Sequence, residues 1–259
     1  MPEKSGFAIG VDVGGTFTDI ILAGPKLFRV LKVPTSSADP SEAVVAGIAQ
    51  LGHEALEAGL LSHATTLATN ALLSRSGVAK TALVTNEGFR DVLEIGRQRR
   101  PEVYDLSTRR PVPLVPRKDR FTVRCRVASD GREVTPLDGA KALSVVRKIV
   151  KENFQSVAIS FLNSYVSGAH ERDMRSLLVK EGFRGHVSLS SEVDRQYREY
   201  ERTSTTVVNA ALSPLMSGYL SRLISSLMRR RLSSPVYVMR SDGGAATVEF
   251  ASARPVSVL

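Results

Sequence analysis

The fold is decided by one stretch, Gly10-Val11-Asp12-Val13-Gly14-Gly15-Thr16-Phe17-Thr18-Asp19. The apolar, β-branched residues at 7–13 predict a buried strand, and residues 17–23 predict a second strand only a short turn later. The two strands therefore form a β-hairpin. Glycines in a tight turn can adopt positive φ and leave backbone N–H groups uncovered, so that an anion reaches the main chain without meeting a Cβ. The turn is thus a candidate phosphate-binding loop.

The polar residues around the two glycines indicate a metal-bound nucleotide. Thr16 and Thr18 add hydroxyl donors, whereas Asp12 and Asp19 would repel a bare phosphate unless Mg²⁺ lay between carboxylate and phosphate. The motif alone fits an ordinary Gly-Gly hairpin turn equally well. It is neither a Walker loop, since no Gly-Lys-Ser/Thr follows, nor a Rossmann fingerprint, since a strand rather than a helix comes next.

Hydrophobic periodicity predicts an α/β fold with a mixed sheet. Residues 27–33 continue as a third strand, and Asp39-Pro40-Ser41-Glu42 begins a helix, because proline is favoured in the first helical turn. Three strands followed by a helix are the start of a ribonuclease-H-like unit. Further strands are expected at 60–65 and 81–85, around a helix at 67–74.

The second half alternates between helices and strands. Five prolines between residues 96 and 136 exclude a regular helix there and predict a surface insertion, with a hairpin at 120–127 before Asp130-Gly131. Helices at 137–153 and 170–181 alternate with strands at 156–161 and 186–189, so parallel strands are expected. We expect two domains, 5–135 with the phosphate loop and the insertion, and 137–259 as a second α/β segment.

The last part of the chain holds a second glycine turn. A long helix at 197–231 is expected to break or bend near Pro214, since proline removes a backbone donor and crowds the preceding turn. A strand at 236–239 then leads into Ser241-Asp242-Gly243-Gly244. Ligand sites of α/β proteins form at such carboxyl ends of strands.

Composition and charge restrict the class of protein. The 35 basic and 26 acidic side chains give a net charge of +9, and twelve Lys or Arg against six Asp or Glu fall between Arg90 and Arg132. Aromatic residues interleave there, yet no nucleic-acid motif accompanies them, so a solvated basic face is the default and steering of anionic ligands the alternative. Cys125 is the only cysteine, which excludes an intrachain disulfide and favours a reducing compartment. No apolar run is long enough to span a membrane, and we expect a cytoplasmic protein.

Six stretches, in order along the chain, are similar to one enzyme family. They are the opening loop, His63-Ala64-Thr65-Thr66-Leu67-Ala68-Thr69-Asn70-Ala71-Leu72-Leu73, residues 85–98, Ser190-Ser191-Glu192-Val193, residues 198–210, and Ser241-Asp242-Gly243-Gly244. The loop resembles the first phosphate loop of the actin, sugar-kinase and Hsp70 superfamily. The whole set resembles the N-terminal part of the hydantoinase/oxoprolinase A subunit.

This resemblance implies an ATP-dependent enzyme that opens a cyclic amide such as 5-oxoproline or a hydantoin by phosphorylating its carbonyl oxygen, with ATP and Mg²⁺ as cofactors. Related proteins activate ketones for carboxylation, which is the alternative reaction. The implied partner is a hydantoinase B-type subunit or a missing C-terminal half, because relatives continue into a second phosphate loop and an adenosine pocket. The chain is then an incomplete catalytic unit, a piece of a split enzyme, or an inactive binding module.

The resemblance also implies roles for particular residues. Asp12 is the metal ligand and, with His63, a catalytic candidate. The phosphate-binding candidates are Gly14, Gly15, Thr16, Thr18, Asp19, Gly243 and Gly244. The substrate-binding candidates are Thr65, Thr66, Asn70, Arg97, Gln98, Glu199 and Arg202. Structural roles remain open for several of them, namely helix capping for the two threonines and ion pairing for the arginines and Glu199.

Overall fold

The computed structural model describes residues 6–36, 38–99, 102–105, 107–108, 111–232 and 234–259. The chain forms two compact units: unit 1 contains residues 1–78 and 215–259, and unit 2 contains residues 79–214. This division differs from the boundary expected near residue 136, because the chain leaves the first sheet, builds unit 2 and then returns through one long helix. That helix, α7 (Glu199–Arg229), contributes its first part to unit 2 and its last part to unit 1. The expected domain start at residue 5 lies outside the described residues.

Unit 1 is built on a six-stranded mixed sheet with the order β12-β11-β4-β1-β2-β3. Its strands are β1 (Ala8–Val13), β2 (Phe17–Gly24), β3 (Leu27–Pro34), β4 (Leu60–Thr65), β11 (Val236–Met239) and β12 (Ala245–Thr247). Neighbours β1, β2 and β3 are antiparallel, whereas β11, β4 and β1 run parallel to one another. The mixed sheet expected from the sequence is confirmed.

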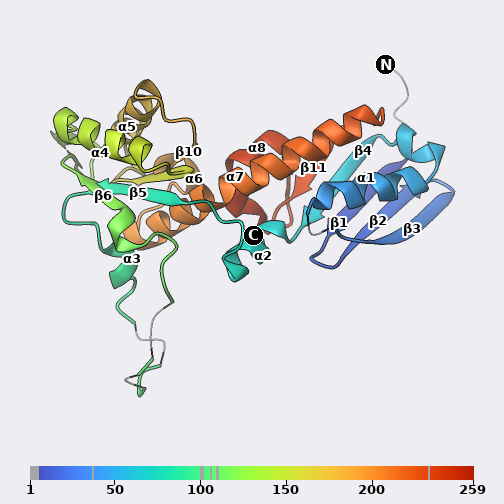
Figure 1. The fold of residues 1–259 in the computed structure, drawn as a ribbon, viewed down its shortest axis with the longest axis horizontal. Helices are drawn as coiled ribbons and strands as arrows, with labels where there is room; N and C mark the ends of the chain where they lie inside the picture. The colour runs from blue at the N-terminus through green and yellow to red at the C-terminus, as the bar shows by residue number, and fades with distance from the viewer. Residues whose placement is uncertain (1–5, 37, 100–101, 106, 109–110, 233) are drawn as a thin grey trace. The chain divides into compact units, whose positions relative to one another are not determined.

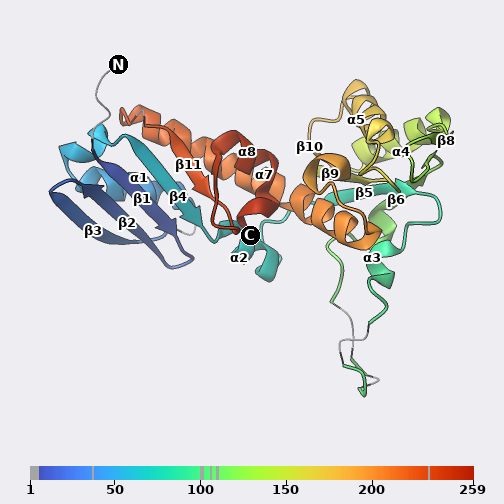
Figure 2. The ribbon, with the colours of Figure 1, turned by 180° about the vertical axis from the view of Figure 1, so that it is seen from behind.

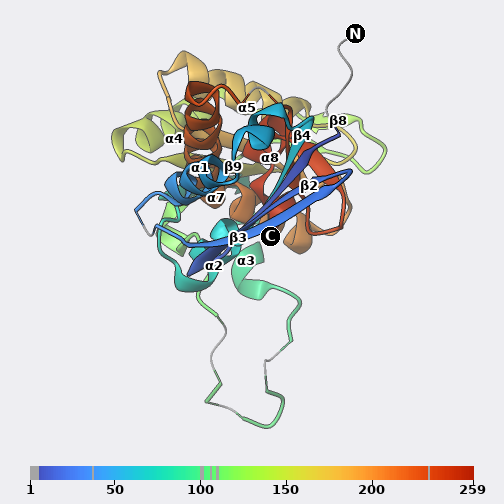
Figure 3. The same cartoon turned by 90° about the vertical axis from the view of Figure 1, so that its right-hand side faces the viewer.

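Helix α1 (Pro40–Gln50) covers one face of this sheet. It begins where the sequence predicts, because the Asp39 carboxylate accepts a hydrogen bond from the backbone N–H of Ser41 and Pro40 starts the helix. Figure 1 shows α1 in front of β1–β3, and Figure 3 shows it to one side of β2 and β3. The remaining elements of unit 1 are η1 (His53–Glu57), α2 (Leu67–Ser74), α8 (Val248–Ala253) and η3 (Pro255–Val258).

Unit 2 is a four-stranded sheet with the order β10-β9-β5-β6, in which every neighbouring pair is parallel. Its strands are β5 (Thr81–Asn86), β6 (Arg120–Val123), β9 (Ser156–Ser160) and β10 (His186–Leu189), and a small ladder pairs β7 (Arg126–Val127) with β8 (Glu133–Thr135). Its other elements are α3 (Val92–Ile95), η2 (Arg117–Asp119), α4 (Gly139–Lys151), α5 (Ala169–Lys180) and α6 (Ser190–Val193). The parallel strands expected from the β/α alternation are confirmed.

Apolar side chains fill both faces of the unit 2 sheet. Ile149 of α4 and Met174 of α5 belong to the core on one face, and Val207 and Ala210 of α7 belong to the core on the other. Figure 1 shows α4 and α5 on the side of β5 opposite to α3. A parallel sheet covered in this way explains why β9 is buried at every position.

Two expectations for the middle of the chain need correction. Residues 96–136 are not simply a surface insertion, because β6 pairs with β5 in the central sheet and Val123 is fully buried. Residues 120–127 do not form one hairpin either, since the antiparallel partner of β7 is β8, across the Asp130-Gly131 turn. The alternation of apolar and polar residues from Phe121 to Val127 is a signal in the sequence that could have indicated a core strand. Part of the expected insertion, at residues 100–101, 106 and 109–110, lies outside the described residues.

Pro214 does not interrupt α7, which continues as one α-helix from Glu199 to Arg229. A proline removes one intrahelical donor, and the surrounding apolar side chains, such as Leu212 and Met216, are fully buried and hold the helix in place. Within the part of the chain that is described, no helix is long and apolar enough to cross a membrane.

Candidate functional site

Three adjacent parallel strands of unit 1 end at the same edge of the sheet. β4 lies between β1 and β11, with Val13 opposite Thr65 and Val238 opposite His63. The carboxyl ends of these strands lead into the Gly14-Gly15 turn, into α2 and into the turn at residues 241–244. Ligand sites of α/β sheets form at this kind of edge. The tertiary structure thus gathers three of the sequence motifs within unit 1.

The Gly14-Gly15 turn is tight, but neither glycine adopts positive φ. The N–H of Gly14 donates to the carbonyl of Phe17 over 3.0 Å, and a Cβ on Gly14 would lie 2.9 Å from that carbonyl oxygen. Glycine is therefore required here by close approach and not by a left-handed backbone. Within the described residues, the N–H groups of Gly15 and Thr16 have no hydrogen-bond acceptor, so these two donors are available to an anion.

The start of α2 is hydrogen-bonded to the end of β1. The backbone N–H of Thr66 donates to the carbonyl of Val13 over 3.0 Å, and the Asn70 amide donates to the Thr66 hydroxyl over 3.2 Å. A Cβ on Gly15 would lie 3.2 Å from Nδ2 of Asn70. Thr66 and Asn70 are therefore next to the glycine turn, as their place among the site candidates requires.

The capping alternative applies to Thr65 more than to Thr66. The Thr65 hydroxyl accepts a hydrogen bond from the backbone N–H of Leu67 over 3.1 Å, which satisfies one free donor of the helix start. Thr66, the N-cap residue by position, makes no capping hydrogen bond with its side chain. Its hydroxyl instead lies between the carbonyl of Val13 and the Asn70 amide.

Asp12 lies on the face of the sheet that α1 does not cover. It is exposed, and its cross-strand neighbour Asp19 forms an ion pair with Lys32 over 2.8 Å. Figure 2 shows β1–β3 from this side, with α1 behind them. Among the described residues no cationic side chain forms an ion pair with Asp12. The hairpin register that pairs Asp19 with Lys32 could have been read from the opposite charges on strands 17–23 and 27–33.

The same open face carries large apolar side chains. Strand register places Phe17 opposite Pro34 and Ile21 opposite Val30. Phe28, opposite Ala23, is the next residue on the same face of the sheet. Phe28 is 70% exposed and Val30 62% exposed. Antiparallel strands often leave one face to solvent, but the side chains on that face are then mostly polar, whereas here several are large and apolar. Asp12 therefore lies at one end of an exposed apolar surface of the kind that another part of a protein usually covers.

The residues around Asp12 fit a magnesium ion bound mainly through water and phosphate. The described residues contain no cluster of three or more His, Cys, Asp or Glu side chains that could hold a metal ion by themselves. Mg²⁺ is bound in many phosphate-transferring proteins by only one or two carboxylates, with waters and phosphate oxygens as its other ligands. A single exposed aspartate beside two free N–H donors matches that pattern.

Thr18 faces the opposite side of the sheet and is fully buried. Its hydroxyl is 2.9 Å from the hydroxyl of Thr35, so it stabilises the hairpin from within. Strand alternation separates it from Asp12 and Asp19, which lie on the open face. Its place among the phosphate-binding candidates is not supported by a free hydroxyl.

His63 is also fully buried, on the side of the sheet that faces α7. Its Nε2 lies 3.0 Å from the hydroxyl of Tyr219, and its Nδ1 has no hydrogen-bond partner among the residues that the structure describes. Burial lowers the pKa of the His63 imidazole from 6.5 to about 4. The contact with Tyr219 could not be predicted from the sequence, because the two residues are 156 positions apart.

The second glycine turn closes a hairpin between β11 and β12. Gly243 has a φ of +83°, and its N–H donates to the carbonyl of Arg240 over 3.1 Å. The N–H of Gly244 donates to the Asp242 carboxylate over 3.0 Å. Both N–H groups are thus engaged within the turn, so this turn offers fewer free hydrogen-bond donors to a ligand than the first turn does.

The other substrate-binding candidates belong to unit 2. Arg97 forms an exposed ion pair with Glu201 over 2.7 Å, and Gln98, with a φ of +56°, follows it. Arg202 is fully buried: it donates to the carbonyl of Phe161 over 3.0 Å and pairs with Glu199. Arg202 and Glu199 therefore fix the start of α7 to the end of β9. These four residues belong to unit 2, whereas the glycine turn belongs to unit 1.

A mixed sheet whose first hairpin presents a glycine turn and an aspartate at its carboxyl edge defines a ribonuclease-H-like α/β protein with a candidate phosphate site. Residues 8–182 match the hydantoinase/oxoprolinase N-terminal region, and residues 202–259 match the hydantoinase/oxoprolinase family. The chain belongs to the hydantoinase/oxoprolinase family.

The relatives in this family are longer than the present chain. An uncharacterized protein of Methanocaldococcus jannaschii is 40% identical over 258 residues, which cover 98% of this chain and 38% of that protein. The caprolactamase subunit alpha of Pseudomonas jessenii is 36% identical, with 94% of this chain and 36% of that protein covered. The chain thus spans little more than a third of the length of these relatives.

Two solved structures share the fold. The nucleotide-free structure of acetone carboxylase, described as carrying out ATP-dependent acetone carboxylation, matches 96% of this chain and 38% of its own with a TM-score of 0.86 and 26% identity. The crystal structure of the ATP-dependent caprolactamase of Pseudomonas jessenii matches the same shares with a TM-score of 0.83 and 34% identity. This chain is therefore homologous to ATP-dependent enzymes.

Proposed function

We propose that this chain supplies the magnesium- and phosphate-binding side of an ATP-dependent enzyme that opens a cyclic amide of the hydantoin or 5-oxoproline type. The observation that carries the proposal is the edge of the unit 1 sheet. There β1 and β4 end side by side, and Asp12, the free N–H groups of Gly15 and Thr16, and the Thr66–Asn70 pair surround one turn.

Each of these groups has a role in the proposal. Asp12 holds Mg²⁺, and Gly15 and Thr16 donate to phosphate oxygens through their backbone N–H groups. ATP, when bound, supplies a phosphoryl group that turns the inert amide oxygen into a good leaving group. Phosphoryl transfer depends mainly on positioning and on neutralising charge, which backbone donors and a carboxylate-held metal provide. Thr66 and Asn70 orient the turn or the substrate beside it.

We assign His63 a positioning role. Its ring is buried on the face opposite to Asp12 and bonded to Tyr219, so it fixes β4 beneath the site without sharing the surface that Asp12 occupies. Thr65 lies two residues further along β4, so the same contact also holds Thr65 in position. Arg97, Gln98 and Glu199 remain candidates for the substrate side, within unit 2, whereas we assign the fully buried Arg202 a structural role.

Carboxylation of a ketone is the second candidate reaction, and the similarity to acetone carboxylase favours it. Both reactions use the same phosphate chemistry, so the phosphate loop does not separate them. We further propose that a second polypeptide or polypeptide half of the hydantoinase B or C-terminal type completes the site, since the names of two relatives, caprolactamase subunit alpha and acetophenone carboxylase gamma subunit, describe subunits.

The test measures Mg-ATP binding to the purified chain by calorimetry, and ATP hydrolysis after its completing polypeptide is added. We expect weak binding and little hydrolysis by the chain alone, because donors on one side of the phosphates are not sufficient. Hydantoin, 5-oxoproline, caprolactam and acetone with bicarbonate are then added one at a time. Stimulation of ATP hydrolysis by a cyclic amide supports the first reaction, and stimulation only by the ketone supports the second. ATP hydrolysis by the completed enzyme that needs no Mg²⁺ would overturn the assignment of the site.

A further inference from the structure

A groove runs between α1 and the last turns of α7 in unit 1, away from the glycine turn. It encloses about 480 Å³. Its floor is formed by buried aliphatic side chains, Val45 and Ile48 of α1, Leu227 of α7, and Leu232, while Leu56 is 40% exposed at its margin. The floor is thus apolar, as is usual for sites that receive apolar groups.

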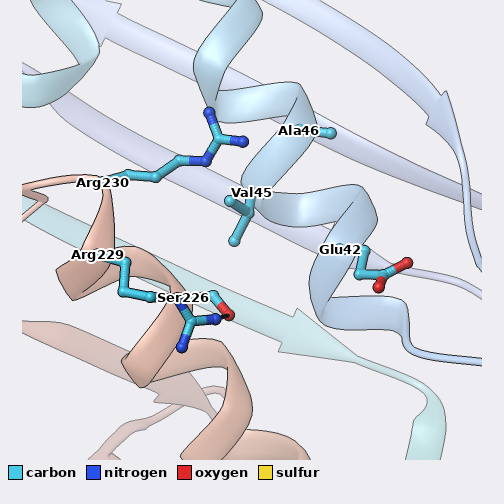
Figure 4. A pocket seen from close by; sticks show the side chains of 6 residues that line it. All are labelled: Glu42, Val45, Ala46, Ser226, Arg229 and Arg230. Atoms are coloured by element: carbon cyan, nitrogen blue, oxygen red, sulfur yellow. Dashed lines mark hydrogen bonds between the residues drawn. The ribbon is translucent and has the colours of Figure 1, made fainter.

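Arginines form the rim of the groove. A second hollow of about 350 Å³ shares Val45 and Arg230 with the first and is also lined by Arg229. Figure 4 shows the guanidinium groups of Arg229 and Arg230 beside this hollow, with the Glu42 carboxylate pointing away from both. The Arg229 guanidinium donates to the Ser226 hydroxyl over 2.7 Å, and in the described part of the chain no carboxylate forms an ion pair with Arg229, Arg230 or Arg231.

Arginines at the end of a helix also interact favourably with its dipole. That interaction is weak at an exposed site, and it accounts for neither the apolar floor nor three consecutive arginines. Several arginines of the described chain are neutralised by a carboxylate, among them Arg29, Arg117, Arg147 and Arg175. The rim of the groove instead carries adjacent positive charges, on Arg229 and Arg230, that no carboxylate of the described residues pairs with.

We propose that the groove between α1 and α7 binds an acidic amphipathic helix of a partner protein. A third helix lying across the mouth of the groove would set its apolar stripe against the exposed Leu56 and against the small part of the aliphatic floor that solvent still reaches. Carboxylates beside that stripe would pair with Arg229 and Arg230. The combination of an apolar floor and an unpaired cationic rim selects this occupant over an uncharged or basic one.

The test uses three fluorescein-labelled synthetic helical peptides and measures their anisotropy as the full chain is added. The first has leucines at i, i+3, i+4 and i+7 spacing and glutamates elsewhere, the second replaces glutamate by lysine, and the third has the composition of the first in scrambled order. We expect the first peptide to bind at least tenfold more tightly than the other two. Equal binding of the striped and scrambled acidic peptides would mean non-specific attraction and would overturn the proposal.

Two pairs of variants locate the binding. Arg229→Glu with Arg230→Glu should weaken binding of the acidic striped peptide at least tenfold, whereas Lys151→Glu with Arg184→Glu, which changes the charge equally on exposed residues of unit 2, should leave it within twofold. Ala49→Trp should block the groove, and Ala140→Trp, on an exposed position of α4, should not. Circular dichroism establishes that each variant is folded. Equal effects of both members of a pair would overturn the proposal.

Two other occupants are tested with the same proteins. Sedimentation of the chain over a range of concentrations detects self-association, and a dimer that Arg229→Glu with Arg230→Glu abolishes would assign the groove to a second copy. Octanoate is added as a small amphipathic anion. Displacement of the labelled peptide by octanoate at a lower concentration than the unlabelled striped peptide requires would assign the groove to a small ligand. Either result overturns the proposal of a partner helix.

Discussion

Asp12 and His63 lie on neighbouring parallel strands, but their side chains project from opposite faces of the sheet. In the β1–β4 register His63 is opposite Val11, and Asp12 is opposite Ala64, so the face that Asp12 shares is the open one. His63 shares the buried face and contacts Tyr219. The two residues that the sequence suggests as catalytic therefore lie in different physical environments. We accordingly expect their substitutions to have different effects.

Asp12→Asn should abolish most of the ATP turnover of the completed enzyme while leaving the fold intact. The substitution preserves size but removes the charge that holds Mg²⁺, and losses of roughly 100-fold or more are usual when one transition-state interaction is removed. Asp12 is exposed and unpaired among the described residues, so the melting temperature should not change. Steady-state kinetics at saturating Mg-ATP measure the rate, with Asp130→Asn, on the surface of unit 2, as the control. Unchanged turnover would show that the metal is held elsewhere.

Gly14→Ala and Gly15→Ala should distinguish the structural requirement of the turn from its role in binding phosphate. A methyl group on Gly14 would meet a backbone carbonyl at 2.9 Å, which should lower the free energy of unfolding by about 1 kcal/mol or more. On Gly15 it would meet only the amide of Asn70, and φ is not positive there, so the loss of stability should be smaller. Nucleotide affinity should fall for Gly15→Ala, because the methyl group occupies the approach to the free N–H groups. Denaturant titration and calorimetry measure the two effects. If Gly15→Ala binds Mg-ATP like the parent, the turn is only a hairpin connection.

The stability of unit 1 should fall as the pH is lowered from about 6.5 to about 4. His63 has a pKa of about 4 in the folded chain against 6.5 when unfolded, so between these values the unfolded state binds the proton more readily. The contribution is complete above pH 6.5 and is lost toward pH 4, and it amounts to about 3 kcal/mol at most. Urea unfolding across this range measures it. His63→Gln should flatten the dependence, whereas His186→Gln, whose imidazole also has a pKa lowered by burial, should keep most of it.

Arg202→Ala and Arg97→Ala should differ strongly in stability. Arg202 is buried, and its removal takes the charged partner from Glu199 and one donor each from the carbonyls of Phe161 and Gln196, at a cost of about 3 kcal/mol or more. Arg97 has an exposed side chain, and its ion pair with Glu201 should contribute less than about 1 kcal/mol. Guanidinium titration of each variant, compared with Arg147→Ala on the exposed pair with Glu181, checks the difference. Similar losses for Arg202 and Arg97 would contradict the structural role of Arg202.

Much of unit 1 could be predicted because its signals are local. The strand at 60–65, the helix at 67–74 and the strand at 236–239 have the predicted bounds, since hydrophobic alternation and turn residues act within a few positions of the chain. The prediction for 96–136 was wrong in part because prolines indicate where a helix cannot form, and they say nothing about whether a short strand joins a sheet. Residues 120–123 are buried by β5, which lies more than thirty positions earlier.

The sequence by itself determined the hairpin, the glycine turn with Asp12 beside it, and the family, because these reside in contiguous residues. Only the tertiary structure decided that β11 and β4 join β1 in parallel, that Arg202 and Thr18 are internal, and that His63 faces Tyr219 away from Asp12. The alternation of a strand fixes which of its own residues share a face. Which residues of another strand share that face depends on register, and register is set by packing between segments far apart in the chain.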